Sequence, residues 1–195
     1  MKVCFLAYDH FAIHSTALLT YFLREFNVQI VYCSEKAGPV STKEGLTVLA
    51  ETDTASVRPA DYSGIIVPGG LSSGCVHTPW IMKLLQAFCE ENTLICSICE
   101  GTILLAHSGV LARKRYTSSY DLSSIDAAKT GVNVKQTVIA DENLITARGQ
   151  SFTEFALVCL KAFGCADSTE LWKLKLRYKP PRFKITWGLK KYGDY

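Results

Sequence analysis

Short apolar runs alternate along the chain with longer segments whose apolar residues recur at helical spacing. The short runs predict strands, and the longer segments predict helices. The expected strands cover residues 2–8, 28–33, 64–68, 93–98 and 115–118, the helices 12–26, 78–91, 100–107, 123–129 and 151–163, and a hairpin 134–147. Because strands that alternate with helices form parallel sheets, this order predicts an α/β fold, a mostly parallel, flavodoxin-like sheet with helices on both faces.

Composition divides the chain at about residue 164. Residues 1–164 carry the alternating pattern and predict one α/β domain. Within it, residues 38–59 are rich in Gly, Pro, Ser and Thr, which predicts an excursion at a sheet edge without a catalytic role. Residues 165–195 predict a short helix and a basic, aromatic tail, since nine Lys or Arg stand against three Asp or Glu from residue 161 onward. We expect this part to pack on the domain or on a dimer partner.

The eight cysteines lie mostly inside apolar stretches, as in Val3-Cys4-Phe5. Buried free thiols have this pattern, so we expect a reducing, cytoplasmic compartment. No apolar run reaches the roughly 18 residues that a membrane span needs. The net charge of +3 is too small to argue for nucleic acid. We therefore expect neither a membrane nor a nucleic acid as a partner.

Two patterns that resemble metal or cofactor motifs do not meet their geometric requirements. Cys96 and Cys99 have C-x-x-C spacing, but three steps along a strand place their side chains on opposite faces, roughly 10 Å apart. No second pair completes a metal site. Gly69, Gly70 and Gly74 lack the order of a dinucleotide-binding loop. We therefore expect no metal and no cofactor.

Cys99 lies where an expected buried strand passes directly into a helix. Gly101 permits a sharp turn there, and the helix start points unpaired N–H groups at the sulfur, which favours the thiolate. The backbone N–H of Glu100, with that of Gly70 or Leu71, predicts an oxyanion hole. The Glu100 carboxylate acts in the opposite direction, because a negative charge near a thiol disfavours the thiolate. On balance we predict that Cys99 is reactive.

Three segments of the chain resemble the ThiJ/PfpI superfamily, within the class I glutamine-amidotransferase-like fold. They are VPGG (67–70), SICEGTILLAHSGVL (97–111) and ENLITARGQSFTEFAL (142–157), and the resemblance extends from residue 1 to about residue 164. It implies that Cys99 is the nucleophile and that the amides of Gly70 and Glu100 form the oxyanion hole. It also implies a homodimer.

Two positions depart from the pattern of that superfamily. Its members usually carry a Glu or Asp just after the first strand, where this chain has His14 or Ser15. Many members carry a His after the strand that follows the cysteine's helix, where this chain has Ser-Ser-Tyr at 118–120. The candidates for a base or polar partner of Cys99 are therefore His14, Ser15, Ser119 and, in the loop after the two glycines, His77.

Two functions of different classes are compatible with these residues. In the first, the protein is an enzyme in which Cys99 attacks a small carbonyl or amide substrate, with hydrolase, amidase or lyase chemistry; the resemblance adds peptidase, glyoxalase and deglycase activities. In the second, it is a non-catalytic stress- or redox-sensing or binding protein whose Cys99 reacts with an oxidant. A glutamine-amidotransferase subunit is disfavoured, because it requires a His-x-Glu pair after the last strands, which the sequence lacks.

Overall fold

The computed structural model describes residues 1–178, apart from the side chain of Ser73, so the basic tail at 179–195 lies outside the described residues. A seven-stranded sheet forms the centre of the fold, with strand order β10-β11-β7-β6-β1-β2-β5. All neighbouring pairs are parallel except β10 with β11. The strands are β1 (Lys2–Leu6), β2 (Gln29–Ser34), β5 (Thr52–Asp53), β6 (Gly64–Val67), β7 (Leu94–Ile98), β10 (Val138–Asp141) and β11 (Leu144–Ala147).

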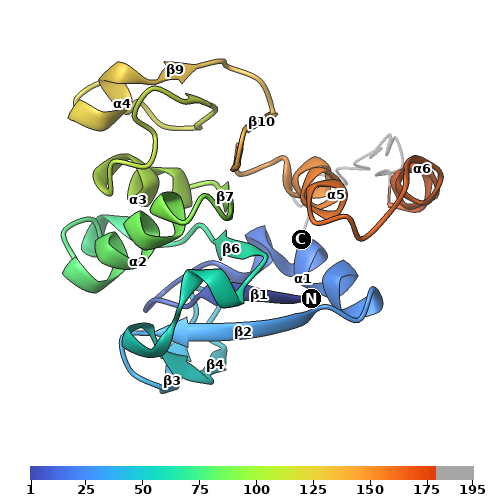
Figure 1. The fold of residues 1–195 in the computed structure, drawn as a ribbon, viewed down its shortest axis with the longest axis horizontal. Helices are drawn as coiled ribbons and strands as arrows, with labels where there is room; N and C mark the ends of the chain where they lie inside the picture. The colour runs from blue at the N-terminus through green and yellow to red at the C-terminus, as the bar shows by residue number, and fades with distance from the viewer. Residues whose placement is uncertain (179–195) are drawn as a thin grey trace, which may run out of the picture.

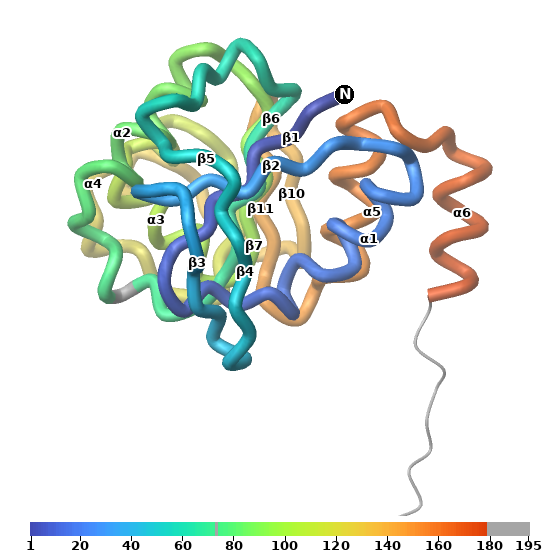
Figure 2. The backbone as a smooth tube through the Cα atoms, turned by 90° about the horizontal axis from the view of Figure 1, so that it is seen from below, coloured from blue at the N-terminus to red at the C-terminus, as the bar shows by residue number. Residues whose placement is uncertain are grey.

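Helices cover both faces of this sheet, as the sequence predicts (Figure 1, Figure 2). One face carries α1 (Ala17–Glu25) and α5 (Phe152–Ala162), with α6 (Ser168–Arg177) packed outside α5. The other face carries α2 (Pro79–Glu90) and α3 (Gly101–His107), with α4 (Asp126–Thr130) against α3. The architecture is therefore the predicted mostly parallel α/β fold.

Smaller elements fill the connections between the strands. A hairpin of β3 (Gly38–Ser41) and β4 (Thr47–Ala50) occupies the Gly- and Ser-rich excursion near β2 and β5. A two-stranded parallel ribbon joins β8 (Arg115–Tyr116) to β9 (Val132–Asn133). Single 3-10 turns are η1 (Ile13–Ser15), η2 (Thr54–Ser56), η3 (Pro59–Asp61) and η4 (Ser72–Gly74).

The core lies on both sides of the central strands. Every residue of β6 is buried, and Ile65, Ile66 and Ile95 have no exposed surface. Such wholly apolar, β-branched strands are typical of parallel sheets covered on both faces. From α5, Phe155 is fully buried against the sheet. Burial of side chains of this size contributes roughly 2–3 kcal/mol each, which makes the sheet a rigid platform for its loops.

Some boundaries differ from the sequence-based prediction for identifiable reasons. The helix expected at 12–26 begins as η1, and α1 starts only at Ala17. The Thr16 N–H bonds to Ile13 O, three residues back, which is a 3-10 bond, and the α-helical pattern begins with the bond from the Thr20 N–H to Thr16 O. The strand expected at 115–118 ends at Tyr116, because the Thr117 N–H donates to the Thr146 hydroxyl.

All eight cysteines lie in the described part of the chain and are free thiols. Cys4, Cys33, Cys96 and Cys159 are buried, as expected for apolar stretches, and the Sγ atoms of Cys4 and Cys33 are 3.1 Å apart. Burial and contact with Cys96 raise the pKa of Cys159. Within residues 1–178, no helix is both long enough and apolar enough to cross a membrane.

The C-terminal helix packs on the body of the domain. Its Leu171 and Leu174 contact the core, and the ring of Tyr178 lies 5.0 Å from that of Phe22 in an edge-on arrangement. An Asp167 side chain caps the helix by accepting from the N–H groups of Thr169 and Glu170. The division of the chain at residue 164 stays a prediction.

Candidate active site

Cys99 lies at a sharp turn between β7 and α3. Its backbone has φ of 58°, a left-handed conformation that costs a residue with a side chain about 1–3 kcal/mol. Two hydrogen bonds hold it there: the Cys99 N–H donates to Ala147 O (3.0 Å), and the Thr102 hydroxyl donates to Cys99 O (2.8 Å). The Cys99 side chain is half-buried rather than sealed in the core.

Gly101 explains how the turn after Cys99 can pack so closely against the neighbouring strand. A Cβ at Gly101 would lie 2.6 Å from Val67 O and 2.7 Å from Pro68 O. Contacts this short are not tolerated between real atoms, so α3 can begin at this place only with glycine. The turn that presents Cys99 is therefore pressed against the carboxyl end of β6, where ligand sites of open α/β sheets occur.

Two further glycines form walls around the sulfur. A Cβ at Gly69 would lie 3.2 Å from Cys99 Sγ, and a Cβ at Gly149 would lie 2.9 Å from it. Gly69 belongs to the turn after β6, and Gly149 to the turn after β11. The thiol is thus enclosed by the turns at the ends of both strands that flank β7.

The two backbone amides expected from the sequence lie in the turns after β6 and β7. In the described part of the chain, neither the Gly70 N–H nor the Glu100 N–H has a hydrogen-bond acceptor, whereas the Leu71 N–H donates to His10 O (3.1 Å). A Cβ at Gly69 would lie 3.5 Å from Glu100 N, so the Glu100 amide borders the same space as the sulfur. We call residues 69–71, in the turn after β6, the glycine turn. Of its two candidate amides, Gly70 and Leu71, Gly70 is therefore the one with a free donor.

Tyr120 contacts the thiol directly. Its hydroxyl lies 3.6 Å from Cys99 Sγ, within hydrogen-bond range for sulfur. The Tyr120 N–H donates to the Ser118 hydroxyl (3.0 Å), which lies 3.0 Å from the hydroxyl of Thr102. Since Thr102 also bonds to the Cys99 carbonyl, a ring of hydrogen bonds joins Tyr120 to the cysteine turn.

The electrostatic surroundings keep Tyr120 protonated. Partial burial raises the pKa of the Tyr120 hydroxyl, and the neighbouring Cys99 and the negative charge of Glu100 raise it further. Ionising the tyrosine would place a second negative charge beside these groups. The hydroxyl is therefore a neutral donor that can bond to a thiolate.

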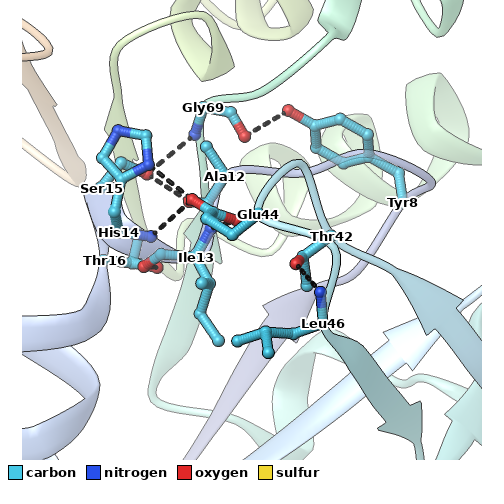
Figure 3. Close-up of polar contacts among 10 residues, drawn as sticks. All are labelled: Tyr8, Ala12, Ile13, His14, Ser15, Thr16, Thr42, Glu44, Leu46 and Gly69. Atoms are coloured by element: carbon cyan, nitrogen blue, oxygen red, sulfur yellow. Dashed lines mark hydrogen bonds and ion pairs between the residues drawn. The ribbon is translucent and has the colours of Figure 1, made fainter.

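The candidate partners chosen from sequence lie in different places. The Ser15 hydroxyl donates to Ala12 O (2.8 Å) and accepts from the Gly69 N–H (3.3 Å), so it supports the glycine turn (Figure 3). The His14 imidazole is 64% exposed and bonds to Glu44, with Nδ1 2.5 Å from Oε1. Ser15 therefore reaches the wall of the site, while His14 is directed to the β3–β4 hairpin.

His77 and Ser119 also have specific partners. The His77 ring lies 5.5 Å from the ring of His107 in an edge-on arrangement. Partial burial and the nearby His77 lower the pKa of His107. The Ser119 hydroxyl accepts from the Gly149 N–H (3.2 Å), at the wall beside the sulfur. The structure thus brings Ser119 to the site through Gly149, and it pairs His77 with His107.

Two contacts near the site are not predictable from the sequence pattern. Tyr120 lies in the segment where many members of the superfamily carry a histidine, and the pattern does not mark it as the partner of the thiol. Glu44 lies in the excursion where no catalytic role was expected, and no sequence signal connects it to His14, because a hairpin brings the two together. Among residues 1–178, no group of three or more His, Cys, Asp or Glu side chains is arranged to hold a metal ion.

The chain is similar in sequence and in fold to known proteins. A deglycase from Pyrococcus abyssi is 27% identical over 150 residues, covering 76% of this chain and 90% of its own. An isonitrile hydratase from Pseudomonas putida is 26% identical over 156 residues, and the match covers 79% of this chain and 68% of the hydratase. The crystal structure of the DJ-1 superfamily protein Atu0886 from Agrobacterium tumefaciens shares the fold, with a TM-score of 0.79, 24% identity and coverage of 91% and 97%.

The family relationship follows from a match that spans most of the chain. The model of the DJ-1/PfpI family matches residues 1–162, a range that includes the whole sheet, the cysteine turn and α5. It ends before α6, close to residue 164, where the composition of the sequence changes. The chain belongs to the DJ-1/PfpI family.

Proposed function

We propose that Cys99 is the nucleophile of an enzyme that acts on a small carbonyl or amide compound, with hydrolase, amidase or lyase chemistry. The observation that carries the proposal is the half-buried Cys99 side chain at a left-handed turn, with the Tyr120 hydroxyl 3.6 Å from its sulfur. A strained conformation that the surroundings hold in place is typical of functional positions. The names of two relatives, a deglycase and an isonitrile hydratase, support an enzymatic function for this family member.

In the proposed reaction the Cys99 thiolate attacks the carbonyl carbon, and a carbon–sulfur bond forms. The electron pair of the C=O bond moves to the oxygen, which accepts hydrogen bonds from the N–H groups of Gly70 and Glu100. With an aldehyde, the oxygen takes a proton and a hemithioacetal results. With an amide, the carbon–nitrogen bond breaks, the amine leaves with a proton, and water then hydrolyses the thioester. The proton in either case comes from water. The Tyr120 hydroxyl, which its raised pKa keeps protonated, is suited to donate a hydrogen bond to the thiolate before the attack.

The test is turnover of methylglyoxal and of a panel of small amides by the wild type and by Cys99→Ser. Cys165→Ser serves as the matched control, since Cys165 is also half-buried but follows α5, in a different part of the fold. We expect turnover of at least one substrate, a loss of about 100-fold or more in the Cys99 variant, and no loss in the control. Turnover that survives Cys99→Ser unchanged contradicts the proposal.

A second function, oxidant sensing, is favoured by one specific observation. In the part of the chain that the structure describes, the only side-chain hydrogen-bond partner of Cys99 Sγ is the hydroxyl of Tyr120. A thiol without a carboxylate or imidazole partner lacks the usual general base for repeated turnover. It can still react with hydrogen peroxide: the thiolate sulfur attacks one oxygen, the O–O bond breaks, and sulfenic acid forms, while the leaving hydroxide takes a proton from solvent and becomes water.

Mass spectrometry after stoichiometric peroxide distinguishes the two functions. The sensor function predicts addition of one oxygen atom at Cys99 before any other cysteine, together with no Cys99-dependent turnover of the substrate panel. The enzyme function predicts turnover, whatever the rate of oxidation. Absence of both reactions at Cys99 contradicts both functions.

A further inference from the structure

The peptide that joins Gly69 to Gly70 is held by its carbonyl oxygen. The Gly69 oxygen accepts a hydrogen bond from the Ala12 N–H (2.7 Å). It also accepts one from the Tyr8 hydroxyl (2.8 Å; Figure 3). The same hydroxyl reaches Pro68 O at 3.1 Å. In a planar trans peptide the C=O and the following N–H point in opposite directions. The two donors on the Gly69 oxygen therefore set the direction of the Gly70 N–H, the free amide of the glycine turn.

Tyr8 is buried almost completely, with 1% of its surface exposed. Burial raises the pKa of its hydroxyl well above the ordinary value, as do the nearby ionisable groups of Cys75, Glu100 and Cys99. The hydroxyl therefore stays protonated and keeps its role as a donor. Its acceptors are carbonyls of the glycine turn, not other side chains, so its contact fixes the backbone of the site.

A short segment, residues 10–12, connects the glycine turn to the β3–β4 hairpin; we call it the strap. On one side the Ala12 N–H donates to Gly69 O and the strap carbonyl of His10 accepts from the Leu71 N–H. On the other side the His10 N–H donates to a carbonyl of the hairpin, and Phe11 O accepts from a hairpin N–H. Isolated β-bridges join Phe11 to Thr42 and to Gly70, so the strap lies between the hairpin and the glycine turn and is bonded to both.

Glu44, at the tip of the hairpin, anchors the end of the strap. Its carboxylate accepts hydrogen bonds from the backbone N–H of Ile13 (3.2 Å), from that of His14 (3.1 Å) and from His14 Nδ1 (2.5 Å). Burial acts against the charged carboxylate, but these hydrogen bonds outweigh it and lower the pKa of Glu44 to about 2. The anchor is therefore ionised at neutral pH.

The strap packs directly against the glycine turn at Gly70, without space for another atom. Gly70 has φ of 138°, and a Cβ there would lie 2.4 Å from His10 O and 2.6 Å from the Cα of Phe11. Even one carbon atom would force the strap and the turn apart. A displacement of the strap must therefore be transmitted to the Gly70 peptide.

We infer that Tyr8 and Glu44 are positioning residues that together aim the Gly70 N–H at the space beside Cys99. Tyr8 holds the Gly69 oxygen directly, and Glu44 holds it through the strap. The inference rests on the proposed function, because it gives the Gly70 amide the task of binding a developing oxyanion. Removing such a donor outright typically costs a factor of 100–1,000, so we expect a displaced donor to cost about 10-fold.

Two reactions of Cys99 Sγ distinguish a displaced Gly70 N–H from a general disturbance of the site. Iodoacetamide alkylates Cys99 by displacing iodide, and no oxyanion forms. Methylglyoxal adds to Cys99 through a hemithioacetal, whose oxygen needs the amide. In Tyr8→Phe and Glu44→Ala we expect the rate constant for methylglyoxal to fall about 10-fold and that for iodoacetamide to change less than about 2-fold. Glu44→Gln, which keeps an oxygen acceptor, should recover most of the loss.

Matched controls are available elsewhere in the chain. Tyr62→Phe removes a hydroxyl from another buried tyrosine, and Glu51→Ala removes another exposed carboxylate beyond β4. Neither residue contacts the strap or the glycine turn through a hydrogen bond of its side chain, so neither control should change the ratio of the two rate constants. Thermal unfolding of each variant verifies that it is folded.

The position of the amide itself provides an independent measurement. In proton–nitrogen correlation spectra, the Gly70 cross peak should move in Tyr8→Phe and in Glu44→Ala but not in either control. Rate constants that fall in parallel for both reagents, or that do not fall at all, overturn the inference. If the wild type turns over an amide of the panel but not methylglyoxal, that amide takes the place of methylglyoxal in the comparison. If it reacts with neither, the proposed enzyme function fails, and the Gly70 cross peak alone decides: an unmoved peak in both variants then overturns the inference.

Discussion

Cys99 Sγ and the Tyr120 hydroxyl lie 3.6 Å apart, although 21 positions separate the two residues in the sequence. Cys99 follows the central strand β7, whereas Tyr120 follows the short strand β8. The loop after β8 therefore closes over the cysteine turn. Partial burial, Cys99 and Glu100 raise the pKa of Tyr120, so its hydroxyl stays protonated and faces the sulfur as a hydrogen-bond donor.

Tyr120→Phe should slow the reaction of Cys99 with iodoacetamide at neutral pH. The hydroxyl stabilises the thiolate, and a hydrogen bond of about 1 kcal/mol corresponds to about a 5-fold effect. The difference should vanish at high pH, where the thiol is ionised with or without the hydroxyl. Rate constants measured across the pH range decide the matter: identical profiles for both proteins would mean that the contact has no chemical effect.

Gly149→Ala should block the site without unfolding the protein. The new methyl group would lie 2.9 Å from Cys99 Sγ, so the sulfur or the turn after β11 must shift. We expect a loss of about 1–3 kcal/mol of stability and a strong loss of Cys99 labelling. Gly74→Ala is the control, since nothing lies within 4 Å of its added Cβ. Labelling of Gly149→Ala at the wild-type rate would disprove this geometry.

The alternation of strands and helices was predictable because each element buries its own apolar pattern. The strand at 64–68 matches β6 (Gly64–Val67), the helix at 78–91 matches α2 (Pro79–Glu90), and the hairpin at 134–147 contains β10 and β11. Boundaries failed where side chains took over backbone hydrogen bonds. The Thr146 hydroxyl does this at the end of β8, and this residue is 29 positions away from Thr117.

The cysteine turn was also predictable from local sequence, since a buried strand, a glycine two places later and a helix are consecutive. The surroundings of the sulfur were not. The contact with Tyr120, the roles of Ser15 and Ser119 as supports of the wall, and the pairing of His14 with Glu44 all join segments distant in sequence. Such contacts depend on how the loops pack against one another in the folded protein. The periodic pattern of apolar residues carries no information about them.

Glu44 should contribute to stability in a pH-dependent way. Its folded-state pKa of about 2 lies below the ordinary value of 4.5, so the contribution is fully present above pH 4.5 and is lost as the pH falls from there to about 2. Since the side chain is 27% exposed, solvent screening leaves a contribution of about 1 kcal/mol. Urea unfolding of the wild type and of Glu44→Gln should differ by this amount at pH 7 and converge in acid. A constant difference at all pH values would contradict the assignment.

We also predict that the protein is a homodimer. Several large apolar side chains are exposed on the described part of the chain, including Leu46 and Leu49 of the β3–β4 hairpin region and Trp172 of α6. Covering such surface is favourable in water. Light scattering at micromolar concentration should give twice the chain mass of 21.6 kDa. A monomeric mass under these conditions would refute the prediction.

Competitive labelling of the cysteines of the native protein tests the central claim most directly. Cys75 and Cys165 are half-buried like Cys99 and serve as internal references. Partial burial raises the pKa of both, and the charge of Asp9 adds to the effect at Cys75. With limiting iodoacetamide and peptide mass spectrometry, we predict that Cys99 is modified at least about 10-fold faster than either. If Cys99 is modified no faster than these two cysteines, or only after unfolding, it is not a reactive nucleophile.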